Sequence, residues 1–359
     1  MATSKAPGRA PIPRRIRLDW RDLSSRAVFF LFFLGLGAFT SWPWLVPSSA
    51  APVRTLVVYG FSILGEAFER GVFPAFQQEW QSNTGQQVEF VSSFSGSGTI
   101  TNQMVMGVPA EVAILSLELD AFRLQEAQVL AGPTWQDLPH HGILNRTPFI
   151  ILVRPGNPHS MTDFADLTRA GIEIVHPDPL TSGGAQWAIL AEYGSAIFLG
   201  GDGSQAEGQL LGIWRNVVAQ ASSARGARTQ FEGGFGDVLI TYEQEAVYDL
   251  ARGRLEAQIV YPRSTILSEH IVVVPEKNIP SGDLPMVRAF TDFLWTDKAQ
   301  QILVDYGFRS VNPELNEGRT EFGFIEIPFT VADLGGWKAA GAEIIQSIWK
   351  DRVLTALHP

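Results

Sequence analysis

Short apolar runs rich in β-branched residues alternate, from Thr55 onward, with segments whose apolar residues fall at helical spacing. The first kind of pattern predicts buried strands and the second predicts amphipathic helices. Between the first two runs, one helical stripe is formed by Phe68, Val72, Phe73, Phe76 and Trp80. The expected strands are Leu56–Tyr59, Val88–Ser92, Val112–Leu115, Phe149–Val153, Ile172–Val175, Val238–Tyr242, Ile259–Tyr261 and Ile271–Val274. This alternation predicts an α/β fold with a largely parallel sheet.

The N-terminus has the order of an export signal. Residues 1–26 carry seven Lys or Arg against two Asp, and Ala27–Phe39 is apolar without a charge. A basic segment before an apolar one is typical of a signal peptide, and the small residues at 48–51 predict cleavage after Ala50. A retained membrane anchor is the alternative, because Ala27–Val46 approaches the roughly 20 residues of a spanning helix. Pro43 and Pro47 shorten the apolar run and favour cleavage. Both readings place the remaining chain outside the cytoplasm.

Composition restricts the partners and the chemistry. The 359 residues are 45% hydrophobic and 18% charged, which suffices for globular lobes with apolar cores. With no cysteine, disulfides, thiolate metal sites and attachment through a lipidated cysteine are excluded. Residues 1–50 hold seven of the 27 basic and two of the 37 acidic side chains, so the remainder has 20 and 35, a formal charge of −15. Such a surface repels nucleic acid, and an anionic ligand would need local dipoles to hold it.

Three loops of small polar residues stand where a predicted strand ends and a helix begins. They are Phe94–Thr99, Thr181–Ala185 and Ser222–Gly226. The start of a helix offers unpaired N–H groups, glycine lets an anion approach them, and hydroxyls add further donors. The loops therefore predict an anion site without a cationic ligand. The competing interpretation is that they are ordinary helix caps and turns. Neither phosphate-cradling glycine motif, G-x-x-x-x-G-K-[ST] or G-x-G-x-x-G, is present, which disfavours nucleotide binding.

Other candidate chemistries have weaker support. The six histidines show no H-x-x-x-H spacing, and we expect His140 and His141 to lie in a solvated loop rather than at a metal. Glu243 and Glu245 resemble a glycosidase pair, but we expect a helix-start or hinge role for them. The motif G-x-S-x-G is missing, so an exported hydrolase that uses Ser97 is only an alternative.

The chain resembles a known family from about Thr55 to Lys350: the sulfate- and thiosulfate-binding proteins of bacterial ABC importers. The resemblance is carried, in this order along the chain, by Ser97-Gly98, Phe149–Pro158, His176–Trp187, Ala224-Arg225-Gly226, Gly236–Glu245, Thr296–Arg309 and Gly335-Gly336-Trp337. It implies an α/β type II periplasmic-binding-protein fold, with two lobes that each hold a mostly parallel sheet flanked by helices. Two crossover strands, within Arg146–Pro158 and Tyr261–Pro275, would join the lobes.

The domain boundaries implied by the resemblance are residues 1–50 for the signal peptide or anchor, 51–149 and 264–359 for lobe 1, and 150–263 for lobe 2. The resemblance also implies the ligand-binding residues. Ser97 would give a hydroxyl from lobe 1, while Ser182, Gly183 and Gly184 would give a hydroxyl and two amides from lobe 2. The further expected residues are Ala224 with an amide, Tyr242 and Ser62 at the ligand, and Arg225 behind them.

Two positions depart from the family pattern. Gly60-Phe61-Ser62 stands where the family has Ser-Tyr-Asp, and Tyr242 stands where it has Trp. A tyrosine hydroxyl can replace an indole donor, whereas the missing Asp opens the site to thiosulfate, a sulfonate, molybdate or phosphate besides sulfate. Monohydrogen phosphate needs an acceptor and fully ionised sulfate does not, so a site made of donors favours sulfate-like anions.

The resemblance implies a periplasmic, non-catalytic protein that captures a sulfate-like oxyanion by hinge closure and delivers it to an ABC permease with its ATPase. We expect a monomer without a cofactor, without a metal and without a nucleic-acid partner. A membrane-tethered anion sensor with the same fold is the other alternative.

Overall fold

The structure is a computed structural model that describes residues 28, 31 and 53–357. Residues 53–357 lie in one compact unit. The strands are β1 (Arg54–Phe61), β2 (Val88–Ser95), β3 (Val112–Leu115), β4 (Ile143–Val153), β5 (Ile174–Pro177), β6 (Val217–Ala221), β7 (Val238–Tyr242), β8 (Gln258–Val260), β9 (Ser264–Val273), β10 (Arg309–Ser310) and β11 (Ile327–Phe329).

The α-helices are α2 (Gly65–Ala67), α3 (Phe73–Thr84), α4 (Ser97–Val105), α5 (Glu118–Glu126), α6 (Gly183–Phe198), α7 (Gly203–Arg215), α8 (Ala224–Glu232), α9 (Gln244–Leu250), α10 (Leu284–Phe293), α11 (Asp297–Asp305), α12 (Gly336–Ala340) and α13 (Leu354–Leu357). Two π-helical segments, η2 (Phe68–Val72) and η9 (Gly341–Val353), continue into α3 and α13. The 3-10 turns are η1 (Ser62–Leu64), η3 (Thr134–Asp137), η4 (Pro139–Gly142), η5 (Phe164–Thr168), η6 (Glu276–Asn278), η7 (Pro313–Asn316) and η8 (Val331–Leu334).

The sheet runs in the order β2-β1-β3-β9-β4-β7-β5-β6, with β8, β10 and β11 paired beside this path. Pairing is parallel within two groups, β2-β1-β3 and β7-β5-β6. Between the groups, β3-β9, β9-β4 and β4-β7 are antiparallel. We call the part built around β1, β2 and β3 lobe 1 and the part built around β5, β6 and β7 lobe 2. The predicted parallel sheet is thus realised inside each lobe, and the joining strands are antiparallel.

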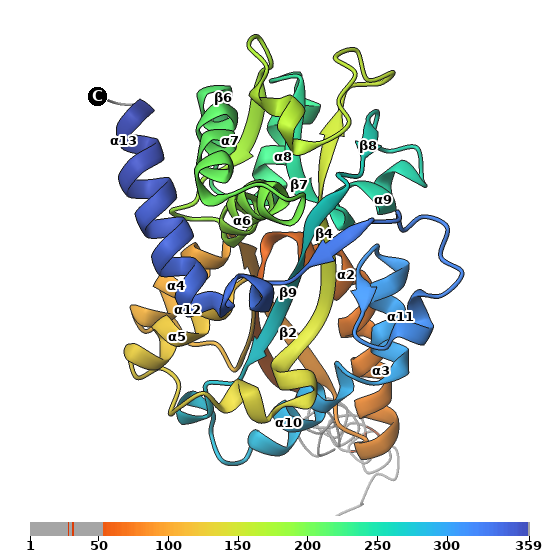
Figure 1. Cartoon of the computed structure of the whole chain (residues 1–359). Helices are drawn as coiled ribbons and strands as arrows, with labels where there is room; N and C mark the ends of the chain where they lie inside the picture. The colour runs from red at the N-terminus through yellow and green to blue at the C-terminus, as the bar shows by residue number, and fades with distance from the viewer. Residues whose placement is uncertain (1–27, 29–30, 32–52, 358–359) are drawn as a thin grey trace, which may run out of the picture. The chain divides into compact units, whose positions relative to one another are not determined.

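Strands β4 and β9 run between the two lobes in Figure 1. The first half of β4 pairs with β9, and its second half, from Phe149, pairs with β7. Strand β9 pairs with β3 at its other end. Strand β9 falls within the second segment expected as a crossover, whereas β4 overlaps the first but begins before it, at Ile143.

The predicted elements are largely present. Each of the eight expected runs overlaps a strand, whereas β6, β10 and β11 were not predicted. The predicted helical stripe lies in η2 and α3, where Phe68 and Val72 are fully buried. There Phe73 stacks on Phe90 of β2 with ring centroids 4.0 Å apart, so the stripe packs against the sheet of lobe 1.

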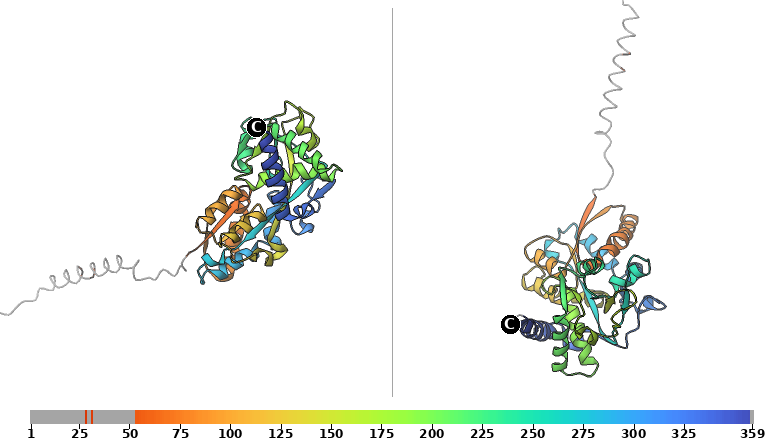
Figure 2. Two further views of the ribbon diagram at one scale, coloured as in Figure 1. Left: turned by 60° about the vertical axis from the view of Figure 1, so that its left-hand side comes forward. Right: turned by 90° about the horizontal axis from the view of Figure 1, so that it is seen from above.

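The C-terminal helix, η9 with α13, lies along the helices of lobe 2, as the views in Figures 1 and 2 agree. Trp349 packs on Trp214 of α7 with ring centroids 5.0 Å apart, and Arg352 forms an ion pair with Glu207 at 2.7 Å. We predicted from the sequence that residues 264–359 belong to lobe 1, but these contacts join the last helix to lobe 2. Trp349, the aromatic residue of this helix, is buried and packs on α7, which ties the helix to lobe 2.

Most of the expected signal segment lies outside the described residues, which include only Val28 and Leu31 of it. Within 53–357 and at these two positions, no helix has both the length and the apolar character that a bilayer crossing requires.

Candidate functional site

A small enclosed cavity lies between the lobes, and the three predicted donor loops meet there. Its lining leaves about 160 Å³ between atoms but is too narrow for a free water molecule. All seven residues expected at the ligand line it: Ser62, Ser97, Ser182, Gly183, Gly184, Ala224 and Tyr242. Phe61, Gly96 and Ser116 complete the lining. Three helices, α4, α6 and α8, begin at this cavity, so their positive dipole ends share one small volume.

Hydrogen bonds at the starts of α6 and α8 show which serine caps its helix and which serine is free to bind a ligand. Ser223 caps α8, because its hydroxyl accepts a hydrogen bond from the N–H of Gly226 at 3.0 Å. Ser182 stands at the same position before α6 but makes no capping bond, although its side chain is buried. Among the described residues, the N–H groups of Gly183 and Gly184 also donate to no protein acceptor. The start of α6 therefore presents a hydroxyl and two amides to the cavity, which a simple cap would not do.

Glycine allows the two lobes to approach at the cavity. A Cβ added to Gly96 of lobe 1 would lie 2.4 Å from the carbonyl oxygen of Thr181 and 2.5 Å from that of Ser222, both in lobe 2. A Cβ at Gly183 would lie 2.7 Å from the hydroxyl of Ser116. Neither glycine has a positive φ, so close approach rather than backbone conformation requires them. The lobes are closed on each other in this structure.

Ser97, at the first position of α4, connects α4 to two other parts of lobe 1: helix α5 and the residue that follows β3. Its hydroxyl donates to the Oδ2 atom of Asp120 at 2.6 Å and accepts from the N–H of Ser116 at 3.0 Å. Burial raises the pKa of Asp120, and the hydrogen bond from Ser97 and the charge of Arg123 oppose that rise. We expected the Ser97 hydroxyl to donate its hydrogen to the ligand, but here it donates that hydrogen to Asp120. The donors that this loop can still offer to a ligand are the backbone N–H groups at the start of α4.

Tyr242, at the end of β7, is fully buried and meets Ser116 across the lobes with 2.8 Å between the hydroxyl oxygens. Trp187 of α6 donates its indole N–H to the carbonyl oxygen of Ser116 at 2.7 Å. Burial raises the pKa of Tyr242, so the phenol keeps its proton at physiological pH. Ser116 of lobe 1 is thereby held by two residues of lobe 2.

No residue that lines the cavity is charged. Arg225, expected behind the ligand, pairs through its side chain with the buried Glu245 at 2.8 Å, and its backbone N–H points to the hydroxyl of Ser62 at 3.5 Å. Glu243 accepts two hydrogen bonds of 2.8 Å from Arg309. Both glutamates are fully buried in ion pairs, which agrees with a hinge role and leaves neither free as an acid or base.

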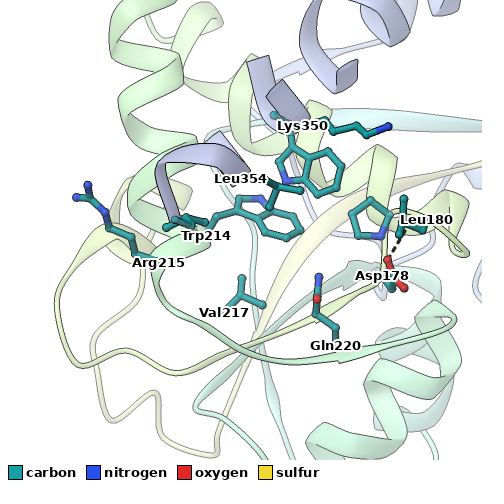
Figure 3. Close-up of a pocket in the computed structure, with 11 residues that line it drawn as sticks. Asp178, Leu180, Trp214, Arg215, Val217, Gln220, Lys350 and Leu354 are labelled. Carbon is teal, nitrogen blue, oxygen red and sulfur yellow. Dashed lines mark hydrogen bonds between the residues drawn. The ribbon is translucent and has the colours of Figure 1, made fainter. Parts of the chain in front are cut away.

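A wider space of about 1000 Å³ adjoins the cavity at Ser62 and includes Arg225. Its lining carries both signs of charge, on Glu66, Glu69, Arg70, Arg228, Glu232, Asp249 and Arg254. Another cavity, of about 1100 Å³, lies elsewhere, between the C-terminal helix and β6 (Figure 3). Trp214, Val217 and Leu354 give it a mainly apolar lining, and Asp178 there accepts from the N–H of Leu180 at 2.9 Å. It contains none of the predicted site residues.

Sequence reasoning did not identify Ser116 or Asp120. The available signal was that Ser116 directly follows the predicted strand Val112–Leu115, where the carboxyl end of a parallel strand usually faces a ligand. His140 and His141 lie in the exposed turn Pro139–Gly142, away from this cavity.

An enclosed, neutral site between two lobes joined by two strands defines a solute-binding protein. The family model of the bacterial extracellular solute-binding proteins matches residues 57–309. The sulfate-binding protein of Synechococcus elongatus is 33% identical over 86% of this chain and 89% of its own length. The thiosulfate-binding protein of Escherichia coli is 34% identical over 74% of this chain and 80% of its own.

Solved structures agree with this assignment. The sulfate-binding protein SubI of Mycobacterium tuberculosis aligns with a TM-score of 0.73 at 29% identity, covering 81% of this chain and 99% of SubI. A periplasmic thiamin-binding protein shares the fold, with a TM-score of 0.63 at 16% identity over 86% of this chain and 99% of that protein.

The chain belongs to the bacterial extracellular solute-binding proteins, and its sulfate- and thiosulfate-binding relatives are similar to it throughout most of their length. The predicted family and type II fold are therefore confirmed, and membership places the protein outside the cytoplasm. These relatives are named as binding proteins rather than as enzymes.

Proposed function

We propose that this protein captures sulfate or thiosulfate between its two lobes and delivers the anion to an ABC permease, without a catalytic step. The observation that carries the proposal is the meeting of three helix N-termini at a cavity without a charged lining residue. Such a site holds an anion by N–H dipoles and hydroxyls. We choose sulfate and thiosulfate among the possible anions because the relatives are named as sulfate- and thiosulfate-binding proteins.

The proposed ligands of the anion follow from the free donors. They are the amides of Gly183 and Gly184, the amide of Ala224 and the hydroxyl of Ser182, with Ser62 and Tyr242 closing the site. Each charge-assisted hydrogen bond contributes about 1.5–3 kcal/mol. Several such bonds together can outweigh the cost of removing the anion from water.

Closure is an essential part of the proposal. The cavity as it stands is too narrow for a water molecule, so an anion must enter while the lobes are open, and the lining side chains must shift to make room for it as the lobes close. We propose a hinge at β4 and β9, with residues 51–149 and the chain after 264 in lobe 1 and 150–263 in lobe 2. The C-terminal helix would move with lobe 2, because it packs on α7. A permease would then recognise the closed monomer.

The N-terminal segment decides how the protein is held outside the cytoplasm. We propose cleavage after Ala50 and release into the periplasm. N-terminal sequencing of the exported protein should begin at Ala51. A chain that retains residues 1–50 would instead be tethered to the membrane, as a sensor or an anchored receptor.

Thermal unfolding in the presence of oxyanions tests the proposed function. The purified protein is measured with sulfate, thiosulfate, phosphate, molybdate and an alkyl sulfonate. An anion at 100 times its dissociation constant stabilises the folded state by about 2.7 kcal/mol. We expect stabilisation by sulfate or thiosulfate at concentrations where phosphate has little effect. The absence of a shift with every anion at millimolar concentration would refute the proposal.

Two substitutions of Gly184 distinguish the effect of an added negative charge on anion binding from the effect of added side-chain volume. A Cβ at this position would lie 3.0 Å from the ring of Tyr242 and 3.3 Å from the Cβ of Ala224, so Gly184→Ala should weaken anion binding moderately. Gly184→Asp adds a carboxylate against the anion and should abolish binding. Gly132→Asp is the matched control, because nothing lies within 4 Å of a Cβ there. Equal affinities of the Ala and Asp variants would argue against an anion at this place.

A further inference from the structure

Ser116 is held in place at the cavity by its backbone. Its N–H donates to the hydroxyl of Ser97 at 3.0 Å, and its carbonyl oxygen accepts from the indole of Trp187 at 2.7 Å. The residue is 1% exposed. With both backbone groups paired, the remaining polar group of Ser116 is the hydroxyl, which lies 2.8 Å from the hydroxyl of Tyr242.

Two hydroxyls bring two hydrogens, and one hydrogen bond between them uses only one. Either oxygen can be the donor at this distance. Among the described residues, neither hydroxyl has another hydrogen-bond partner, and both residues line the cavity. The second hydrogen is therefore available to a group inside the cavity, whichever way the first is shared.

We propose that Ser116 and Tyr242 act as one shared donor, in which one hydroxyl binds the oxyanion while the other holds the first across the lobes. This inference rests on the proposed function and adds Ser116 to the binding residues. It also gives a physical reason why a tyrosine serves at a position where the family pattern has tryptophan. An indole donates alone, whereas the tyrosine hydroxyl works with a serine from the opposite lobe.

A shared donor predicts that each hydroxyl replaces the other. In Ser116→Ala, the hydrogen of Tyr242 turns from the serine to the anion, and in Tyr242→Phe the hydrogen of Ser116 does the same. Each single variant loses only the bond between the hydroxyls, and its dissociation constant should rise roughly 2- to 10-fold. The second substitution then removes the last donor and should raise it a further 10- to 100-fold, roughly.

The experiment is a double-mutant cycle measured by isothermal titration calorimetry, with whichever of sulfate and thiosulfate binds the wild-type chain more tightly. Ser195→Ala is the matched control, since its hydroxyl donates to the carbonyl oxygen of Glu192 outside the cavity. This control should bind like the wild type. The melting temperature without ligand verifies that each variant is folded.

The proposal is supported when the double variant loses far more affinity than the product of the two single losses. It is overturned when the losses multiply, as for two independent donors, or when one single variant already binds as weakly as the double. If the double variant does not fold, a loss above about 100-fold in either single variant overturns it too. A wild-type chain that binds no oxyanion would instead refute the proposed function, and this inference with it.

Discussion

Gly96→Ala should keep the protein folded but prevent full closure of its lobes. The backbone of Gly96 has φ −57° and ψ 135°, a conformation that alanine adopts without strain. Its added methyl group would, however, meet the carbonyl oxygens of Thr181 and Ser222 at 2.4 and 2.5 Å. Ordinary contacts of a Cβ begin at 3.4 Å, so the lobes would have to separate by about 1 Å at the site.

A separation of about 1 Å lengthens a hydrogen bond from the usual 2.9 Å to about 3.9 Å, beyond the range in which it is effective. An anion anchored on lobe 1 would then lose contact with the amides of Gly183 and Gly184 in lobe 2. Two charge-assisted bonds contribute about 3–6 kcal/mol. The dissociation constant should therefore rise by about 100-fold or more.

Isothermal titration calorimetry with sulfate or thiosulfate measures this loss, and small-angle X-ray scattering with saturating anion reports whether the lobes close. Gly132→Ala is the control, because its added methyl group touches nothing within 4 Å. It should bind like the wild type. If Gly96→Ala binds within about threefold of the wild type, contact between the lobes at Gly96 does not limit anion binding.

Two further predictions concern stability. Burial lowers the pKa of His270 from 6.5 to about 3, so the unfolded chain gains a proton below pH 6.5 while the folded chain stays neutral. Stability is fully present above pH 6.5 and should fall by about 1.4 kcal/mol per unit as the pH decreases toward 3. Urea unfolding at pH 7 and pH 5 gives the loss of unfolding free energy between the two pH values, and this loss should be smaller for His270→Gln than for the wild type. An equal loss in the two proteins would show that His270 does not cause the pH dependence. Separately, Glu243→Gln leaves Arg309 without its buried counter-charge and should cost about 3–5 kcal/mol in chemical unfolding. Glu326→Gln breaks an exposed ion pair and should change the free energy of unfolding little. Equal losses of stability in the two variants would show that burial does not determine the contribution of these ion pairs.

The sequence predicted the parts of the fold and site that depend on local patterns. Strands β3 and β7 have the bounds expected from their apolar runs. The loops before α4, α6 and α8 were recognised because glycine and serine at a helix start have a local chemical meaning. The resemblance to the family then joined the loops into one site, which the cavity between the lobes agrees with.

What the sequence did not predict depends on packing between distant segments. Ser116 meets Tyr242 only because the lobes close, and 126 positions separate the two residues. The carboxylate of Asp120 faces Ser97 only after α4 and α5 have packed together. Strand β6 (Val217–Ala221) lies at the edge of the sheet, where its side chains are partly exposed, and its short run of two valines followed by alanine and Gln220 gives only a weak strand signal.

A crystal structure of the protein with sulfate or thiosulfate would show whether neutral donors at the helix N-termini of this cavity hold the anion. We predict one anion between the lobes, with its oxygens 2.7–3.2 Å from the N–H groups of Gly183, Gly184 and Ala224. We also predict that no Lys or Arg side chain contacts the anion. An anion bound outside this cavity, or held there by the side chain of Arg225, would overturn the proposed site.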